Sequence, residues 1–281
     1  MLSDDLISKH IRPLYPHATA LQPSGELATK VKCIVFDVYG TLFISGSGDI
    51  GIAKQKVRQT EQLINLLQKF GIRRYPDAVL NDFFAAIDNQ HAELKANGID
   101  FPEVEIDKIW MHVLNNNNLD LIRAFAVEFE LIVNPVYPMP NLEMMLAGCK
   151  ESNLCMGIVS NAQFYTPSMF QWYLGSDPED LGFHPDLMLF SYKFGYAKPS
   201  TYLFQLAAES LQNMGIPVNA ALYLGNDMLN DIYPAQKVGF KTALFAGDAR
   251  SLRLREDDPG CKNLSPDIII TDLIQLLDHI R

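Results

Sequence analysis

Acidic and polar residues follow directly after several short apolar runs of this 281-residue chain. Asp37 ends the run CIVF, Ser160 and Asn161 follow LCMGIV, and Asp227 and Asp231 come after ALYLG. Such runs are typical of buried parallel strands, whose carboxyl ends meet at one edge of the sheet, where ligands bind. We therefore expect these side chains to converge on one site.

The most chemically capable of these groups is Asp37. A carboxylate at this position can attack a substrate and form a covalent acyl intermediate that water then hydrolyses. Lys198, in the sequence GYAKPS, would bind the negative charge of the transferred group together with the hydroxyl groups of Ser160 and Thr41. Asn161 would contact the substrate beside them. Together these residues predict hydrolysis through a covalent intermediate on Asp37.

The remaining carboxylates predict a metal site. Asp227 and Asp231 would help Asp37 to hold Mg²⁺, a hard cation that prefers one or two carboxylates together with water and substrate oxygens. We expect the backbone carbonyl group of Tyr39 to be a further ligand. The ion would let an anionic nucleophile approach an anionic substrate. Asn226 is the alternative to Asp227, because the register of this loop is not fixed by the sequence.

The elements that must position these groups alternate along the chain. Predicted strands lie at residues 31–36, 154–159, 187–190, 221–224, 242–245 and 268–270, with helical segments at 201–214 and 232–238. Strands that are apolar nearly throughout, alternating with helices, indicate an α/β fold with a parallel sheet covered on both faces.

One long interval after the first strand contains only helical patterns, at residues 53–70, 77–96, 106–114 and 119–129. We therefore divide the chain into an N-terminal arm (1–30), a core domain (31–48 and 136–281) and a helical cap domain (49–135). The glycine-rich ISGSGDI, residues 44–50, is the predicted hinge, because glycine allows the backbone rotations of domain closure.

Two residues of the predicted cap are spaced to reach a substrate together. His91 and Lys95 are four residues apart, so both lie on one face of the helix predicted at 77–96. Glu103 follows in the sequence GIDFPEVEI. We include His91 and Lys95 among the candidate substrate-binding residues. The alternative is an ordinary solvated helix face.

The order of these motifs resembles the haloacid dehalogenase (HAD) superfamily. Its first motif is an apolar strand ending in D-x-[DYA]-G-T, here residues 37–41, and its second is a strand ending in Ser/Thr-Asn, here 160–161. Its third is a lysine before proline, here Lys198, and its fourth is an acidic loop, here GNDMLND at 225–231. The family places a mobile cap between the first two motifs. The resemblance implies a Rossmann-like, three-layer core, an aspartyl-ester intermediate on Asp37 and, in most members, Mg²⁺-dependent phosphoryl transfer. The resemblance therefore predicts that the chain is a phosphatase acting on a small phosphorylated metabolite.

Tyr39 departs from the pattern of the family's phosphatases. They carry a second aspartate at that position, which protonates the leaving oxygen, whereas the D-x-Y-G-T form is that of the 2-haloacid dehalogenases, which use no metal. The acidic fourth motif favours the phosphatase, because Asp227 and Asp231 without a cation would weaken Asp37 as a nucleophile. A metal-independent 2-haloacid dehalogenase and a catalytically weak binding protein stay open as alternatives. Since tyrosine is a poor acid at neutral pH, we expect activated leaving groups, or a proton from His91.

The composition limits the class of partner. The chain is 48% hydrophobic and 20% charged, which is typical of a soluble globular protein. Its formal net charge of -10 argues against nucleic acid or an anionic membrane as the main partner. No signal-peptide pattern or apolar run of membrane-spanning length is found, which predicts a cytoplasmic protein. The four cysteines lack metal-binding spacing, and nothing in the sequence indicates an oligomeric state.

Overall fold

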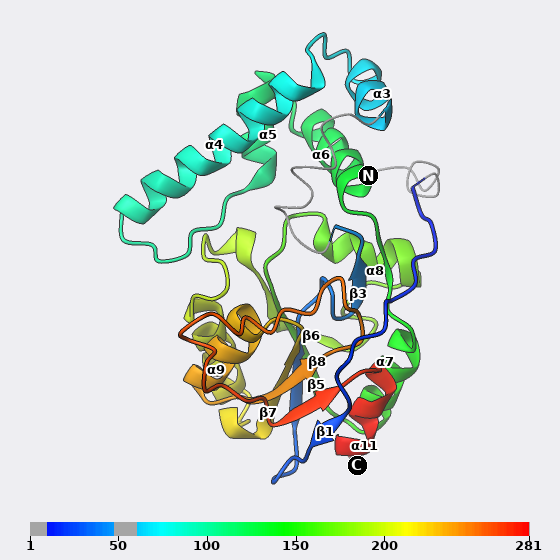
Figure 1. Cartoon of the computed structure of the whole chain (residues 1–281), viewed down its shortest axis with the longest axis vertical. Coiled ribbons are helices and arrows are strands. Elements are labelled where there is room, and N and C mark those ends of the chain that lie inside the picture. The colour runs from blue at the N-terminus through cyan, green and yellow to red at the C-terminus, as the bar shows by residue number, and fades with distance from the viewer. Residues whose placement is uncertain (1–9, 48–60, 281) are drawn as a thin grey trace.

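The computed structural model describes residues 10–47 and 61–280 (Figure 1). Its centre is a seven-stranded sheet in which all neighbouring strands are parallel except the edge pair β1 and β9. In spatial order the strands are β1 (Ser24–Gly25), β9 (Ile268–Ile270), β8 (Lys241–Phe245), β7 (Ala221–Gly225), β2 (Cys33–Phe36), β5 (Cys155–Ser160) and β6 (Phe183–Phe190). The predicted α/β fold with a Rossmann-like sheet is confirmed.

Helices cover both faces of the sheet because the central strand is apolar on both sides. In β2, Ile34 and Phe36 belong to a cluster with α7, α8 and α11, whereas Cys33 and Val35 pack with α9 and α10. The core helices are α7 (Leu142–Glu151), α8 (Thr166–Leu174), α9 (Tyr202–Asn213), α10 (Tyr233–Val238) and α11 (Leu276–Ile280). Short 3₁₀ helices lie at η2 (Ser191–Lys193), η3 (Val218–Ala220) and η5 (Leu273–Gln275), and η4 (Met228–Ile232) is a π-helical turn.

Four further helices lie together at one end of the sheet (Figure 1). They are α3 (Glu61–Lys69), α4 (Pro76–Ala96), α5 (Ile106–Leu114) and α6 (Leu119–Val133). They share a separate hydrophobic cluster, in which Phe83 stacks on Trp110 with ring centroids 4.1 Å apart. Residues 48–60, which include the start of the first predicted helix and one domain boundary, lie outside the described residues, so the domain division stays a prediction. Across the described residues, no helix is both long and apolar enough to span a membrane.

The two connections between the core and these helices are joined to each other. β3 (Phe43–Ser45) pairs antiparallel with β4 (Val136–Pro138). Beside this ribbon, the side-chain oxygen of Asn134 accepts hydrogen bonds from Ser45 Oγ at 2.8 Å and Ser47 Oγ at 2.9 Å. Part of the predicted hinge therefore lies in a hydrogen-bonded ribbon, and its residues 48–50 lie outside the described part. Strands of three residues are too short to stand out as a pattern in the sequence.

The N-terminal arm is held along the segment that follows β8. The amide of His17 donates to Asp248 Oδ1 at 3.0 Å, and the amide of Ala249 donates to the carbonyl oxygen of His17 at 2.8 Å. Thr19 Oγ1 donates to the carbonyl oxygen of Ala246 at 2.8 Å. Together with the pairing of β1 and β9, these bonds fix the arm to the edge of the sheet and to residues 246–249, which follow β8.

The cluster among the four helices predicts a local stability effect. Trp110 is fully buried and in contact with three aromatic rings. We expect Trp110→Ala to lower the free energy of unfolding by about 3–5 kcal/mol, because the lost contacts leave a cavity. Urea denaturation followed by circular dichroism measures the change. As a control, Tyr75→Ala at an 86% exposed position should change it by less than about 0.5 kcal/mol. Similar losses in both variants would contradict this packing.

Candidate active site

The carboxylate of Asp37 lies at the end of β2, between the ends of β5 and β7. The Asp37 amide donates to the carbonyl oxygen of Leu224 at 2.9 Å, which continues the pairing of β2 with β7. Asp37 Oδ1 accepts hydrogen bonds from Ser160 Oγ at 2.8 Å and from Lys198 Nζ at 2.7 Å. Within the described part of the chain, no hydrogen bond reaches Oδ2, the other oxygen of this carboxylate. One oxygen of Asp37 is therefore fixed and the other is available.

Lys198 connects Asp37 to a second carboxylate. Its ammonium group lies 2.5 Å from Asp231 Oδ1 and 3.1 Å from the hydroxyl oxygen of Tyr223. Burial lowers the pKa of Lys198, but the carboxylates of Asp231 and Asp37 outweigh that effect and raise the pKa above its ordinary value. The side chain therefore stays a cation between two anions.

Asn161 holds the backbone of this lysine. The Lys198 amide donates to Asn161 Oδ1 at 2.7 Å, and Asn161 Nδ2 donates back to the Lys198 carbonyl oxygen at 3.1 Å. This reciprocal pair uses the acceptor and a donor of the Asn161 amide. In this structure Asn161 positions Lys198, and its substrate-binding role stays a prediction.

Both carboxylate oxygens of Asp231 accept hydrogen bonds from the protein. Its Oδ1 contacts Lys198, and its Oδ2 accepts from the amides of Asn226 and Asp227, both at 2.9 Å. Burial raises the pKa of Asp231 to about 6, although Lys198 partly offsets this and Asp37 adds to it. A Cβ atom on Gly225 would lie 2.4 Å from the Asp231 carboxyl carbon, so the close approach requires glycine.

Asp227 is likewise engaged elsewhere. Its Oδ1 accepts from the amide of Leu229 at 2.9 Å, and its Oδ2 forms an ion pair of 2.7 Å with Arg255 Nη2. In this structure Asp227 is therefore engaged with Arg255, and a metal site formed by Asp227, Asp231 and Asp37 stays a prediction. Among the described residues, no group of three or more His, Cys, Asp and Glu side chains is arranged to hold a metal ion. The metal ion was expected because the carboxylates of Asp37, Asp227 and Asp231 would otherwise repel one another. In the structure, Lys198 pairs with Asp37 and Asp231, and Arg255 pairs with Asp227.

The neighbouring Asn226 takes the place next to the first motif. Asn226 Oδ1 accepts from Thr41 Oγ1 at 3.2 Å, and its Nδ2 would lie 2.7 Å from a Cβ atom on Gly40. The free oxygen of Asp37, the Tyr39 carbonyl group and the Asn226 side-chain oxygen are all hard donors. One carboxylate with neutral oxygens suits Mg²⁺, which keeps several waters and substrate oxygens in proteins. This smaller donor set fits the ion implied by the resemblance.

Tyr39 and Thr41 are held by internal contacts. The Tyr39 hydroxyl group and Thr166 Oγ1 are joined by a hydrogen bond of 2.9 Å. Burial, and after it the charge of Glu130, raise the pKa of Tyr39, so the phenol stays protonated. Thr41 is fully buried and hydrogen-bonded to Asn226. Both side chains thus form hydrogen bonds within the protein, and the roles expected for Tyr39 and Thr41 at the site stay predictions.

A cavity of about 550 Å³ joins this carboxylate site to the helices above it. From α4, His91 lines the cavity, whereas Lys95, one turn further on, is exposed and is not among the lining residues. The polar wall includes Asp37, Lys198 and Asn226, and the opposite wall includes aromatic residues such as Phe129. The structure thus brings one of the two candidate cap residues to the site.

The loop between α4 and α5 is docked onto the active-site segments through Glu103. Ser191 Oγ donates to Glu103 Oε2 at 2.7 Å, and Gln163 Nε2 donates to Glu103 Oε1 at 3.2 Å. The amide of Ala197, which precedes the lysine of the third motif, donates to the Phe101 carbonyl oxygen at 2.7 Å. Gln163 lies just after the second motif. One loop therefore connects the second and third motifs.

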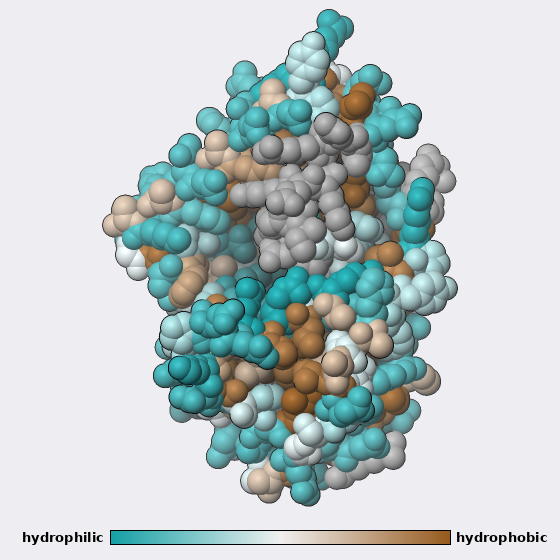
Figure 2. Space-filling model, in the orientation of Figure 1, coloured by the Kyte–Doolittle hydropathy of each residue, from teal (hydrophilic) through white to brown (hydrophobic). Residues whose placement is uncertain are grey.

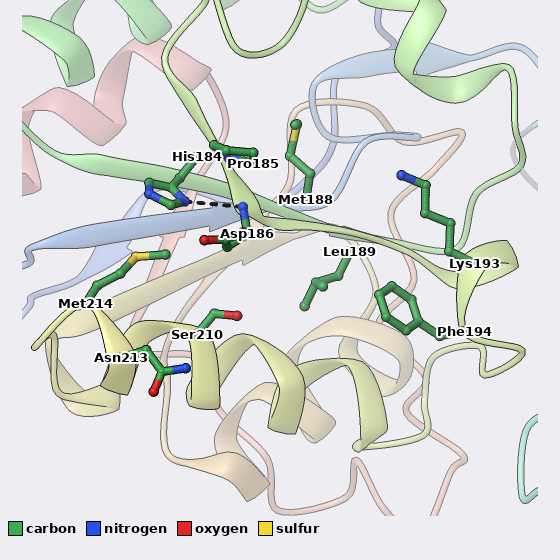
Figure 3. Close-up of a pocket in the computed structure, with 10 residues that line it drawn as sticks. All are labelled: His184, Pro185, Asp186, Met188, Leu189, Lys193, Phe194, Ser210, Asn213 and Met214. Atoms are coloured by element: carbon green, nitrogen blue, oxygen red, sulfur yellow. Dashed lines mark hydrogen bonds between the residues drawn. The ribbon is translucent and has the colours of Figure 1, made fainter.

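A second cavity, also of about 550 Å³, shares no lining residue with the first. It lies between β6 and α9 and is lined by His184, Asp186 and Lys193 on one side and by Ser210 and Asn213 of α9 on the other (Figure 3). The amide of Asp186 donates to His184 Nδ1 at 3.3 Å. None of the residues predicted from the sequence lines it, so the carboxylate site remains the candidate active site.

Several residues of the site were not predicted from the sequence. Arg253 and Arg255 line the first cavity, and so does Ser251. The alternation S-L-R-L-R was visible, with a polar residue at every second position. Tyr223, inside the apolar run ALYLG, gave no signal, because aromatic residues are common in buried strands.

Comparisons with known proteins support the fold described above. No family model matches the chain. It is 23% identical over 256 residues to the glyceraldehyde 3-phosphate phosphatase of Methanocaldococcus jannaschii, covering 89% of this chain and 97% of that protein. It is similar to the structure of a 2-haloacid dehalogenase from Pseudomonas syringae pv. Tomato (17% identity, 89% of this chain and 98% of that one, TM-score 0.55). It is also similar to that of a HAD phosphatase from Thermococcus onnurineus (16% identity, 88% and 97%, TM-score 0.53).

The chain shares its fold with a 2-haloacid dehalogenase and a HAD phosphatase, and its four motifs resemble, in their order, those of the haloacid dehalogenase superfamily. Phosphatases and dehalogenases share the fold, so the reaction has to be argued from the site.

The Glu103 contacts predict a pH dependence of stability. Burial raises the pKa of Glu103, although its hydrogen bonds to Ser191, Val104 and Gln163 oppose the shift. The folded protein then binds this proton more tightly than the unfolded chain. Stability from this group is therefore lost as the pH rises from the unfolded pKa, about 4.3, through the raised folded pKa.

Glu103→Gln removes this titration while keeping the shape of the side chain. Relative to wild type, the variant should become more stable as the pH rises from 4 to 7. Urea denaturation at a series of pH values measures the difference. Glu93→Gln, on the exposed face of α4, is the matched control. A pH-independent difference for Glu103→Gln would contradict the prediction.

Proposed function

We propose that the chain is a phosphatase that hydrolyses monoesters of small phosphorylated metabolites through Asp37. The observation that carries the proposal is the asymmetry of this carboxylate. Oδ1 is held by Ser160 and Lys198, whereas Oδ2 has no hydrogen bond from the described residues. A nucleophile that is fixed at one oxygen and available at the other is positioned for in-line attack. The relative from Methanocaldococcus jannaschii, which is named as a phosphatase, supports this choice.

The reaction proceeds in two displacements at phosphorus. Asp37 Oδ2 attacks the phosphorus atom, and the bond from phosphorus to the ester oxygen breaks, which releases the alcohol. Water then attacks the phosphorus of the aspartyl phosphate, releasing phosphate and regenerating the carboxylate. Lys198 and Ser160 lie beside the developing negative charge, and their hydrogen bonds keep Asp37 oriented.

Mg²⁺ is the cofactor that we propose for this reaction. Asp37, the Tyr39 carbonyl group and Asn226 would hold it, in place of the originally predicted set with Asp227 and Asp231. Bound there, the ion would neutralise charge on the phosphoryl oxygens. The contacts of Asn226 with Thr41 and Ser251 would keep its side-chain oxygen in position.

The leaving alcohol needs a proton unless it is already a stable anion. Tyr39 is a poor proton donor because its raised pKa makes the phenol a weak acid and its hydroxyl group is hydrogen-bonded to Thr166. His91 lines the cavity and is the candidate donor that we retain. We therefore propose that the enzyme prefers aryl phosphates to alkyl phosphates. Hydrolysis of an aryl phosphate loses less rate when no general acid is present, because the aryl oxide is already a stable anion.

A second candidate function is hydrolysis of 2-haloacids. Tyr39 in the first motif favours it, as does the neutral Asn226 beside Asp37. In that reaction the same carboxylate would displace halide from carbon, and no leaving oxygen would need a proton. The similar structure from Pseudomonas syringae pv. Tomato is named as such an enzyme.

A substrate panel with and without metal tests the proposed function. We expect Mg²⁺-dependent release of phosphate from aryl and alkyl phosphates, faster for the aryl esters. EDTA should abolish it and added Mg²⁺ should restore it, because a single carboxylate holds the ion weakly. Release of halide from 2-haloacids that EDTA does not affect would instead establish the second function.

Substitution of the nucleophile tests the covalent step. We expect Asp37→Asn to lower kcat by at least about 10³-fold, because a neutral amide is a far weaker nucleophile than a carboxylate. Thermal unfolding should show that the variant folds. The exposed Asp77→Asn is a control for removal of one negative charge. Activity of Asp37→Asn within tenfold of wild type would exclude the mechanism.

A further inference from the structure

The segment at residues 251–255 runs alongside the fourth motif and pairs with it at Arg253, and it ends in Arg255, whose backbone is left-handed (φ 53°). The amide of Arg253 donates to the Asn226 carbonyl oxygen at 3.0 Å, and the amide of Met228 donates to the Arg253 carbonyl oxygen at 2.8 Å. Asp227 and Arg253 form an isolated bridge of the parallel type. The fourth motif therefore fixes where these side chains point.

Side chains of an extended segment alternate between its two faces. Ser251, Arg253 and Arg255 line the active-site cavity, whereas Leu252 and Leu254 pack against the apolar cluster of the core. The face of the molecule in Figure 2 shows hydrophobic residues gathered over the middle of the core, below a band of hydrophilic residues. The alternation delivers two guanidinium groups and one hydroxyl group to the same wall as Asn226.

These cations are held in place by the protein itself. Arg255 is paired with Asp227 through both Nε, at 3.1 Å, and Nη2, at 2.7 Å. Arg253 Nη1 donates to the carbonyl oxygens of Arg250 at 2.7 Å and Leu252 at 3.0 Å. Both arginines line the active-site cavity as well as making these contacts. Pre-organised guanidinium groups are well suited to bind carboxylate or phosphate oxygens.

A buried hydroxyl group adds an independent observation. Ser251 is 3% exposed, and its Oγ has no hydrogen-bond partner among the described residues. Its backbone carbonyl oxygen accepts from Asn226 Nδ2 at 2.5 Å, so the residue is fixed beside the reaction centre. Buried polar atoms without a partner are rare in proteins, and one that lines a cavity points to a ligand.

We propose that Ser251, Arg253 and Arg255 form a second anion-binding subsite, so that the substrate carries a carboxylate or a second phosphate besides the phosphate that is cleaved. The inference rests on the proposed phosphatase function and narrows its substrate class. At the reaction centre itself, the charge of Lys198 is matched by Asp37 and Asp231. Arg253 and Arg255, the latter paired with Asp227, bring two further cationic groups to the cavity wall of a chain whose formal net charge is -10.

Matched ligands that differ only in the second anion test the subsite. The probes are 3-phosphoglycerate against glycerol 3-phosphate, and fructose 1,6-bisphosphate against fructose 6-phosphate. Calorimetric titration onto Asp37→Asn measures affinity without turnover. In at least one pair, we expect the doubly anionic ligand to bind at least about tenfold more tightly than the singly anionic one. The pair that shows this difference identifies the second anion as a carboxylate or as a phosphate.

Substitution of the arginines tests whether they cause the preference for the doubly anionic ligand. In the Asp37→Asn background, Arg253→Gln and Arg255→Gln should each remove most of it while changing the affinity for the singly anionic ligands little. A general distortion would weaken both members of a pair alike. Arg253→Lys, which keeps the charge but not the planar fork, should keep part of the preference. Arg73→Gln, at an exposed position away from the lining residues, is the control.

The outcomes separate this inference from the proposed function. Equal affinities within both pairs, or a preference that survives both glutamine variants, would overturn the subsite even if the wild type hydrolyses phosphate esters. Failure of the wild type to hydrolyse any phosphate ester would overturn the proposed function, whereas an arginine-dependent preference in the titrations would still support an anion subsite.

Discussion

The ammonium group of Lys198 lies between two buried carboxylates, and most of the site is arranged around it. It is 2.7 Å from Asp37 and 2.5 Å from Asp231. Burying three charges costs desolvation, which only close geometry and further hydrogen bonds can offset. Those bonds come from Asn161, which holds the lysine backbone, and from Tyr223, which contacts the ammonium group. Removing one partner of such a group typically costs about 3–5 kcal/mol, so the charges and the fold around them depend on one another.

The same constraint extends outward to the loops. Asp231 accepts from two amides of the fourth motif, which places Asn226 beside the first motif and turns Asp227 towards Arg255. Arg255 belongs to the extended segment that lines the cavity. On the other side, Glu103 joins the segments that follow β5 and precede Lys198. Contacts from the core and from the helical unit thus converge on the backbone that carries the lysine.

The fold could be predicted from the sequence because buried parallel strands have a recognisable composition. The strand predicted at 268–270 and the helix predicted at 106–114 match the structure residue for residue. The edge on which Asp37, Ser160 and Lys198 meet follows from the same rule, since ligands bind at the carboxyl ends of such strands. The roles of these three residues stay predictions.

The directions of individual side chains could not be predicted in this way. Whether Asn226 or Asp227 lies beside Asp37 depends on a π-helical turn at 228–232, where a shift of one residue exchanges the two. Arg255 is 28 residues from its partner Asp227, and only the pairing of 251–255 with the fourth motif brings them together. The contact of Tyr39 with Thr166 spans 127 residues. Such contacts leave no periodic pattern in a single sequence.

The central claim is that Asp37 becomes covalently phosphorylated during turnover. Rapid acid quench of the enzyme mixed with an aryl phosphate, followed by peptide mass spectrometry, tests it most directly. The account predicts a mass increase of one phosphoryl group on Asp37 within the peptide that contains β2, and no such adduct in Asp37→Asn. A phosphoryl group on another residue, or turnover of the phosphate ester with no adduct at the earliest quench times, would contradict it.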